Sequence, residues 1–179
     1  MRIIAGSRKG ARIFAPKDRA TRPTSDRVRE NVFNIVSPWV EGARVLDLYA
    51  GSGAMGLEAL SRGAKAAVLV ETDRDAVRAI ERNLDKLRLT GARVIRLEVT
   101  TALAQEAAAG RKYDLVLVDP PYAMTDYDAL ALYLNRVLAD DGLLVLETSA
   151  RIEPELAGLS VRTSRKYGST RVTVFELEP

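Results

Sequence analysis

The chain has 179 residues, of which 47% are apolar and 28% are charged, so it can form one packed domain and is not expected to be disordered. It contains no Cys and no His, which excludes disulfides, thiolate nucleophiles, Cys- or His-ligated metals and the usual general base near neutral pH. No apolar stretch is long enough to cross a bilayer, and no secretory signal is recognisable, so we expect a cytoplasmic protein.

The charges are unevenly distributed along the chain. Residues 1–44 carry ten Lys/Arg against four Asp/Glu, residues 45–150 twelve against sixteen, and residues 151–179 five against four. A basic N-terminal segment on an acidic body indicates contact with a polyanion, with a merely solvated, Arg-rich surface as the alternative.

The N-terminal segment is predicted to form a β-hairpin followed by a helix. Residues 2–5 and 11–14 are short apolar runs on either side of a basic loop, a pattern typical of a hairpin. Thr24 can cap a helix that runs to about Ser37 and ends at Pro38.

From residue 44 onwards the pattern alternates between strands and helices. Strands are expected at 44–49, 66–71, 93–98, 113–119 and 143–148, and helices at 54–62, 73–89, 100–109 and 127–139. This alternation predicts a parallel sheet with right-handed crossovers. A turn is expected at 140–142. The last two strands, 159–167 and 170–177, are too close for a helical crossover and should form an antiparallel hairpin at the sheet edge.

A glycine-rich loop follows the first strand. Gly51, Gly53 and Gly56 match G-x-G-x-x-G, a pattern that fits both a dinucleotide site and a tight packing turn. Asp47, four residues before Gly51, would repel a pyrophosphate and would suit a ligand with an ammonium group, such as S-adenosylmethionine. The alternative is that Asp47 only caps the loop.

Acidic residues are also expected at the ends of the next two strands. Glu71 is placed to accept hydrogen bonds from two ribose hydroxyls, whereas Asp73 is expected to cap the following helix. Glu98 is placed to accept a hydrogen bond from an adenine amine, or else is a solvated strand end.

The most specific string in the chain, DPPY, follows the fourth strand. Asp119 should lie at the cleft over the sheet, and neither Pro120 nor Pro121 can donate a backbone hydrogen bond. The Asp119 carboxylate and the Pro120 carbonyl can therefore accept from an exocyclic amine, while Tyr122 can stack on the ring that bears it. As a structural loop, the same string is ordinary turn chemistry.

These motifs resemble a known family. DLYAGSG, the acid at Glu71 and DPPY are similar to class I S-adenosylmethionine-dependent methyltransferases that methylate amines. RIIAGSRKG, RPTSDRVRENVFNIV, DLYAGSGAMGLEALSRGA, DPPY and KYGSTRV together resemble the RsmD family over nearly the whole chain. Members of that family methylate guanine N2 in bacterial 16S ribosomal RNA.

The resemblance implies an α/β, Rossmann-like seven-stranded sheet with helices on both faces. Strands 1–5 would be parallel and would precede a C-terminal antiparallel hairpin. Residues 1–37 would be an RNA-binding extension and residues 38–179 the methyltransferase domain. The implied cofactor-binding residues are Asp47, Tyr49, Ala50, Gly51, Ser52, Gly53, Glu71, Thr72, Glu98, Val99 and Asp119. Asp119, Pro120 and Tyr122 would hold the target base. The family more commonly has Asp or Asn where this chain has Glu98.

Methylation of an exocyclic amine does not require His or Cys, because the sulfonium is already a strong methyl donor and the protein mainly positions the reactants. We expect the partner to be 16S rRNA or an assembling small subunit, with no metal, no membrane and a monomeric enzyme. The expected RNA contacts are Arg8, Lys9, Arg12, Arg19, Arg22, Arg27 and Arg29, some of which can pair with Asp26 or Glu30 instead.

Three alternatives stay open from the sequence. G-x-G-x-x-G and Glu71 also fit an NAD(P)-dependent oxidoreductase, against which Asp47 and the absence of His count. An amino-methyltransferase could act on DNA adenine, another RNA or a protein amide. A non-catalytic RNA-binding module is the third.

Overall fold

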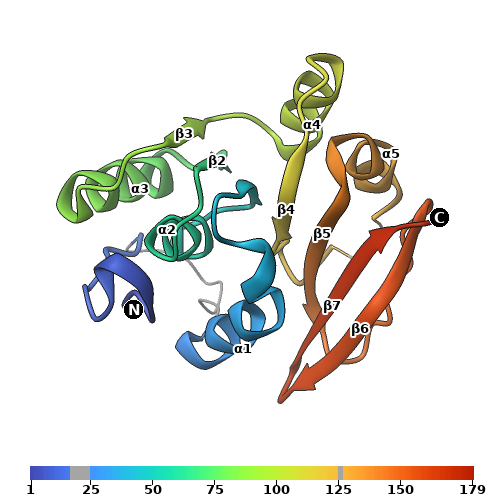
Figure 1. Cartoon of the computed structure of the whole chain (residues 1–179), viewed down its shortest axis with the longest axis horizontal. Coiled ribbons are helices and arrows are strands. Elements are labelled where there is room, and N and C mark those ends of the chain that lie inside the picture. The colour runs from blue at the N-terminus through green and yellow to red at the C-terminus, as the bar shows by residue number, and fades with distance from the viewer. Residues whose placement is uncertain (17–24, 125–126) are drawn as a thin grey trace.

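The structure is a computed structural model that describes residues 1–16, 25–124 and 127–179 (Figure 1). Its helices are α1 (Asp26–Val36), α2 (Ala54–Ser61), α3 (Arg74–Leu87), α4 (Val99–Ala108) and α5 (Asp128–Val137), with short 3-10 helices at Gly6–Arg8 and Ser37–Trp39. Its strands are β1 (Arg44–Leu48), β2 (Ala66–Val70), β3 (Ala92–Ile95), β4 (Tyr113–Val118), β5 (Leu138–Ser149), β6 (Leu159–Tyr167) and β7 (Thr170–Leu177).

The strands form one seven-stranded sheet in the order β3-β2-β1-β4-β5-β7-β6. The first five strands are parallel, and β7 pairs antiparallel with both β5 and β6. The predicted fold class, including the C-terminal hairpin at one edge, is therefore confirmed. The chain runs outward from β1 to β3 and then crosses to β4, so the direction of winding reverses between β1 and β4.

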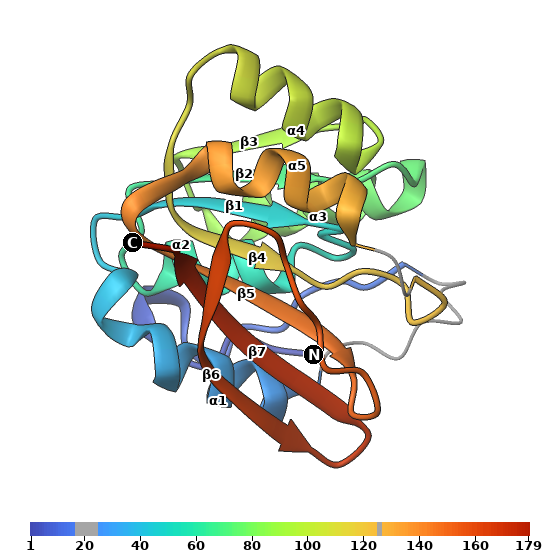
Figure 2. The same cartoon turned by 90° about the vertical axis from the view of Figure 1, so that its right-hand side faces the viewer.

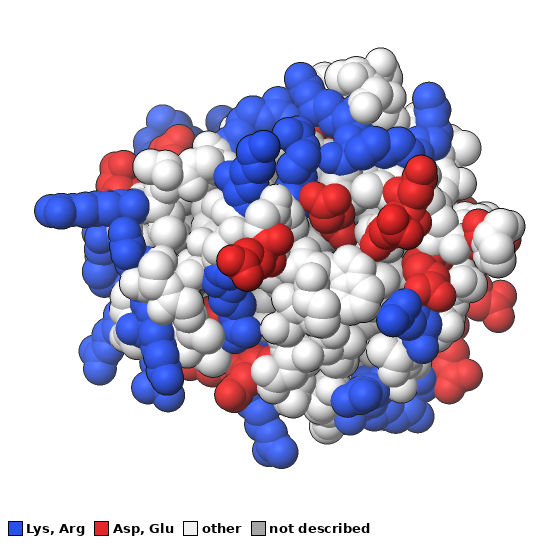
Figure 3. Space-filling view, viewed as in Figure 1, with Lys and Arg blue, Asp and Glu red and all other residues white. Residues whose placement is uncertain are grey.

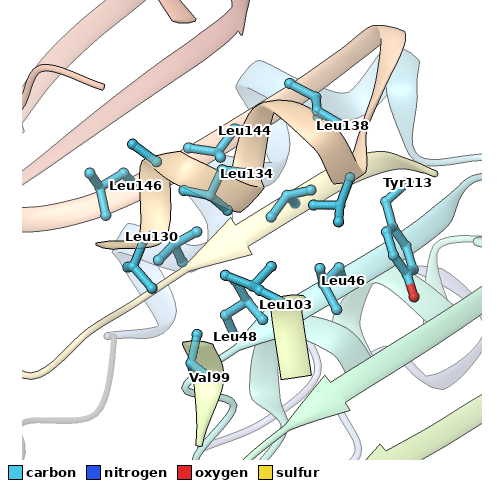
Figure 4. Packing of buried hydrophobic residues seen from close by; sticks show 14 of the residues in the cluster. Leu46, Leu48, Val99, Leu103, Tyr113, Leu130, Leu134, Leu138, Leu144 and Leu146 are labelled. Carbon is cyan, nitrogen blue, oxygen red and sulfur yellow. The ribbon is translucent and has the colours of Figure 1, made fainter. Parts of the chain in front are cut away.

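The sheet is the middle of three layers (Figure 2). One apolar cluster joins alternate residues of the central strands to α4 and α5. Figure 4 shows leucines of β1 beside Leu103 of α4, and leucines of β5 beside leucines of α5. A second cluster joins the other face of the same strands to α1, α2 and α3. Both faces are covered, and the central strands are accordingly almost entirely apolar, apart from Arg44 and Asp47 in β1 and Asp114 in β4.

The N-terminal segment packs on the body of the molecule and is not a regular hairpin. Its two predicted strands are reduced to one antiparallel bridge between Arg2 and Arg12. The buried side chains Ile3 and Ile13 contact α2 and α3 through a third apolar cluster, so packing against the helices replaces most of the strand pairing.

Helix α1 begins one residue after its cap, Ser25, whose hydroxyl accepts from Val28 N at 3.2 Å. Thr24, the cap favoured by the sequence, lies outside the described residues.

The predicted turn at residues 140–142 is wrong. These residues belong to β5, which already pairs with β4 at Leu138 and Tyr113. The pairing shifts between Tyr113 and Leu115, so the extra residues of β5 form an irregularity within the strand and not a turn before it.

Candidate active site

The carboxyl ends of β1 and β4 lie side by side at the point where the winding reverses. Leu48 is level with Val118, and Asp119 N donates to Leu48 O at 3.5 Å. Leu48 is also level with Val70, the last residue of β2. The residues that follow these strands therefore meet at one edge of the sheet, where doubly wound folds bind their ligands.

The loop from β1 to α2 needs its glycines for two different reasons. Tyr49, Gly51 and Gly53 have φ values of 59°, 59° and 80°, and such left-handed backbone favours glycine. A Cβ on Gly53 would lie 3.1 Å from Leu69 Cδ2, and one on Gly56 would lie 2.9 Å from the same atom. The glycines thus turn the chain sharply and bring α2 close to β2.

Two buried carboxylates hold this loop. Asp47 Oδ2 accepts from Gly56 N at 2.8 Å. Glu71 Oε2 accepts from Gly51 N at 2.8 Å, and its Oε1 accepts from Thr72 N and from the next backbone N–H, at 2.8 and 3.0 Å. Asp47 therefore does cap the loop, which was the alternative to ligand binding considered for it. Asp73 caps α3, as predicted, by accepting from Ala76 N at 2.7 Å.

Burial raises the pKa of Asp47 from 3.8 to about 7. The hydrogen bond from Gly56 N opposes this rise, whereas the negative charges of Asp119 and Glu71 add to it. A positively charged group at this edge would relieve the repulsion and favour the ionised carboxylate. The chemistry of the donor set therefore fits a cationic, hydroxyl-bearing ligand such as S-adenosylmethionine.

A tyrosine and a glutamate lie near the far side of the loop. The Tyr49 hydroxyl donates to Met124 Sδ at 3.5 Å, and its pKa is raised by burial and by the negative charge of Glu98. Glu98 does not end a strand, because β3 stops at Ile95. It occupies the cap position of α4 without a side-chain capping bond, and it is exposed.

The other residues predicted to bind the cofactor differ in burial and in the groups they contact. Val99 is buried in the α4–α5 cluster, and Thr72 is exposed. Ala50 N donates to Val70 O at 3.0 Å. The Ser52 hydroxyl lies 3.6 Å from Met1 Sδ, so that side chain faces the N-terminal segment.

The DPPY segment follows β4 directly at the same edge. Asp119 is half-buried, Pro120 is buried and Tyr122 is 45% exposed. Pro121 O accepts from Met124 N at 2.9 Å, but no described residue donates to the Pro120 carbonyl. The Tyr122 hydroxyl is 3.4 Å from Thr170 Oγ1 at the start of β7.

The predicted RNA-contacting residues differ in their availability. Lys9, Arg12 and Arg27 are exposed, whereas Arg8 donates from Nε to Leu87 O at the end of α3. Arg19 and Arg22 lie outside the described residues. In the view of Figure 3, Lys and Arg side chains lie around much of the face, so they are not confined to the N-terminal segment.

The prediction that Arg29 contacts RNA is wrong. It is fully buried, donates to Arg2 O and to Asp26 Oδ1, and lies 3.6 Å from Glu58. Glu58, also fully buried, accepts from Ile4 N at 2.8 Å. Arg29 therefore holds the N-terminal segment against α1 and α2 and is not available to RNA.

No role was predicted for the end of β6, where Lys166 and Tyr167 line one hollow together with Tyr122. The only signal for it was the KYGSTRV string, which carried the resemblance without a function.

The described residues contain neither a membrane-spanning helix nor a cluster of metal ligands. None of their helices is long and apolar enough to span a membrane. Within the same ranges, no cluster of three or more Asp or Glu could hold a metal ion.

Comparisons with known proteins agree over nearly the full length. A family model described as "Conserved hypothetical protein 95" matches residues 1–176. Ribosomal RNA small subunit methyltransferase D of Escherichia coli (strain K12) is 40% identical over 150 residues, which cover 83% of this chain and 74% of that protein. YlbH of Bacillus subtilis (strain 168) is 38% identical over 181 residues, or 98% of each chain.

Solved structures are also similar to this chain over nearly its full length. The structure of yhhF from Escherichia coli matches with a TM-score of 0.87 at 36% identity, covering 99% of this chain and 98% of that one. We call residues 49–53, with Asp47 and Glu71 that hold them, the acidic glycine loop. This fold, with the acidic glycine loop and DPPY at one sheet edge, defines a class I S-adenosylmethionine-dependent methyltransferase. More narrowly, the chain belongs to the "Conserved hypothetical protein 95" family, the RsmD family.

Proposed function

We propose that this enzyme transfers a methyl group from S-adenosylmethionine to the exocyclic N2 amine of a guanine in small-subunit ribosomal RNA. The observation that carries the proposal is the register of β1 and β4. It puts the acidic glycine loop and the DPPY segment next to each other at the switch point of the sheet.

The donor side of the site consists of residues from β1, β2 and the start of α4. When bound, S-adenosylmethionine supplies a methyl group on a positively charged sulfur. Asp47 would hold the ammonium group of its methionine portion and Glu71 its ribose hydroxyls. Glu98, beside Tyr49, is the acceptor for the adenine end. The turn at Gly51 and Gly53 lets the backbone approach closely.

The acceptor side consists of DPPY. The Asp119 carboxylate and the Pro120 carbonyl would accept hydrogen bonds from the target amine and stabilise the positive charge that develops on its nitrogen. Tyr122, with nearly half of its surface exposed, would stack on the base. Because the proton can leave after transfer, no base with a pKa near 7 is needed. The base must leave its stack or lie in an unpaired loop to reach this site.

The choice of guanine N2 rests on the resemblance of the motifs to the RsmD family. The choice of small-subunit rRNA is supported by the name of the E. coli relative. Residues 1–37 would serve mainly as an RNA-binding extension, with Lys9, Arg12 and Arg27 on the surface. We further propose that residues 38–179 are the catalytic domain and that the enzyme works in the cytoplasm as a monomer without a metal.

The test is methyl transfer to a substrate that lacks the modification. Labelled S-adenosylmethionine would be incubated with the enzyme and either naked 16S rRNA or small ribosomal particles, and the labelled nucleotide would be mapped by mass spectrometry. We expect label at N2 of one guanine. Label on another base, on protein or on neither substrate would contradict the proposal.

A further inference from the structure

A hollow of about 520 Å³ lies beside Tyr122, between the start of α1 and the turn that joins β6 to β7. Its wall includes Arg27 from α1 and the last two residues of β6, Lys166 and Tyr167. Its volume is within the roughly 300–1,000 Å³ typical of pockets for small ligands, which is enough for one nucleotide. The proposed function gives roles to Tyr122 and Arg27 but none to the rest of this hollow.

We propose that this hollow binds the RNA nucleotide adjoining the target guanine, with its phosphate between Arg27 and Lys166. The inference rests on the proposed function, because it requires an RNA strand whose target base is held at DPPY. It adds a second subsite that fixes the strand next to the reacting nucleotide.

The hollow borders the candidate active site. Tyr122 belongs to DPPY and lines the hollow, and its hydroxyl lies 3.4 Å from Thr170 Oγ1, which lines the hollow too. A strand that places one base against Tyr122 would therefore bring the next nucleotide to this space. The shared residue Tyr122 favours the adjoining nucleotide over a free small molecule.

The two cations are available for a phosphate. Arg27 and Lys166 are exposed, and neither side chain makes a hydrogen bond or ion pair with any described residue. They come from segments far apart in the sequence and line the same opening. Exposed, unpaired cations on both sides of an opening are typical of contacts to a nucleic-acid backbone.

The wall of the hollow indicates how the nucleotide is oriented. Glu147 lines it from β5, and only 6% of its surface is exposed. The negative charge of a carboxylate in the wall repels a phosphate. The phosphate should therefore lie at the rim, near the two cations, while the ribose or base faces inward beside Tyr167.

The first test is a double variant, Arg27→Ala with Lys166→Ala, and a matched control, Lys65→Ala with Arg136→Ala. The control residues are exposed. Lys65 directly precedes β2 and Arg136 lies near the end of α5, so both are close to the amino ends of parallel strands, whereas the hollow is near the carboxyl end of β5. Both doubles remove two positive charges, so a difference between them reports position and not net charge.

We expect the Arg27/Lys166 variant to raise KM for the RNA about 10- to 100-fold, with kcat within about threefold and cofactor affinity unchanged. The slope of log Kd against log salt should fall in magnitude by about 1.4, the effect of two lost phosphate contacts on a single strand. The control should stay close to the parent. Equal effects of the two doubles would overturn the inference.

The second test uses the absence of native cysteine. The single thiol introduced by Lys166→Cys is labelled with a short photocrosslinker, with Lys65→Cys as the control. We expect crosslinks to the nucleotide next to the methylated guanine from the first variant alone. Crosslinks elsewhere, or none, would contradict the subsite. The mapped methylation of the unlabelled enzyme tests the proposed function separately.

Discussion

At the scale of single residues, the candidate site is built from side chains that both shape the backbone and face a ligand. Asp47 holds Gly56 N, and Glu71 holds Gly51 N. The sequence predicted these acids from their place at strand ends, because the end of a parallel strand fixes where its next side chain lies. The sequence could not predict that Arg29 is buried, since this burial depends on Glu58, which is 29 positions away.

Asp119→Ala should slow methyl transfer at least about 100-fold while leaving the fold and cofactor affinity largely intact, because an acceptor for the amine is lost. Asp119→Asn is the matched control, since its amide oxygen still accepts a hydrogen bond, and it should retain an intermediate rate. Single-turnover kinetics with saturating RNA would measure both. Near-parental turnover of the alanine variant would exclude Asp119 from the reaction.

Asp47→Asn should have opposite effects on stability and on cofactor binding. The folded pKa of about 7 exceeds the ordinary 3.8, so the ionised carboxylate destabilises the cofactor-free protein as pH rises from about 4 to 7. The neutral amide should raise the free energy of unfolding at pH 8 by up to about 2–4 kcal/mol. Urea unfolding at pH 5 and pH 8 would measure this, and a variant less stable at pH 8 would contradict it.

The same carboxylate predicts how cofactor affinity depends on pH. A bound ammonium group favours the ionised form, so affinity should rise with pH up to about 7 and then level off in the parent. Calorimetry with S-adenosylhomocysteine should show weaker binding to Asp47→Asn and no such rise. A parent affinity that is constant from pH 5.5 to 8 would argue against contact with Asp47.

At the scale of elements, the alternating strands and helices were predicted from their periodicity. Central strands such as β4 are apolar on both faces, which gives a strong signal. The segments predicted poorly depend on packing that the sequence does not display. The N-terminal strands are reduced to one bridge because Ile3 and Ile13 pack on α2 and α3, and β3 ends early, at Ile95.

Arg29→Met should unfold more easily than the parent, by about 3 kcal/mol, because Glu58 would lose its buried partner. Its RNA affinity per folded molecule should keep the parental salt dependence. Arg27→Met, two residues earlier and exposed, is the control and should show the reverse pattern. Urea unfolding and RNA titrations at several salt concentrations would test the pair. A stable Arg29→Met with altered salt dependence would restore Arg29 as an RNA contact.

At the scale of the whole molecule, the ligand site lies at the carboxyl ends of the parallel strands, whereas a charged cluster lies near the amino ends of β3 and β4. Glu106 in α4 is buried and accepts from the Tyr113 hydroxyl and, at 2.7 Å each, from Arg93 and Arg111. Burial alone would raise the pKa of Glu106, but these hydrogen bonds and the two positive charges outweigh it, and its pKa is lowered.

Glu106→Gln should therefore lower stability at pH 7, by about 1–3 kcal/mol, since charge-assisted hydrogen bonds are lost. A lowered pKa contributes stability above the ordinary value of 4.5, and this contribution is lost as pH falls through the folded value. The difference between parent and variant should thus shrink in acid. Thermal unfolding from pH 3 to 7 would measure it, and a constant difference would exclude this ionisation.

We propose that the glycine loop after β1 and the DPPY segment after β4 form one site. A crystal structure of the enzyme with S-adenosylhomocysteine would test this arrangement most directly. We expect the ligand over residues 49–53, with its amino group at Asp47, its ribose at Glu71 and its sulfur facing Asp119 and Pro120. A ligand bound elsewhere, or a sulfur directed away from DPPY, would show that the two segments do not form one site.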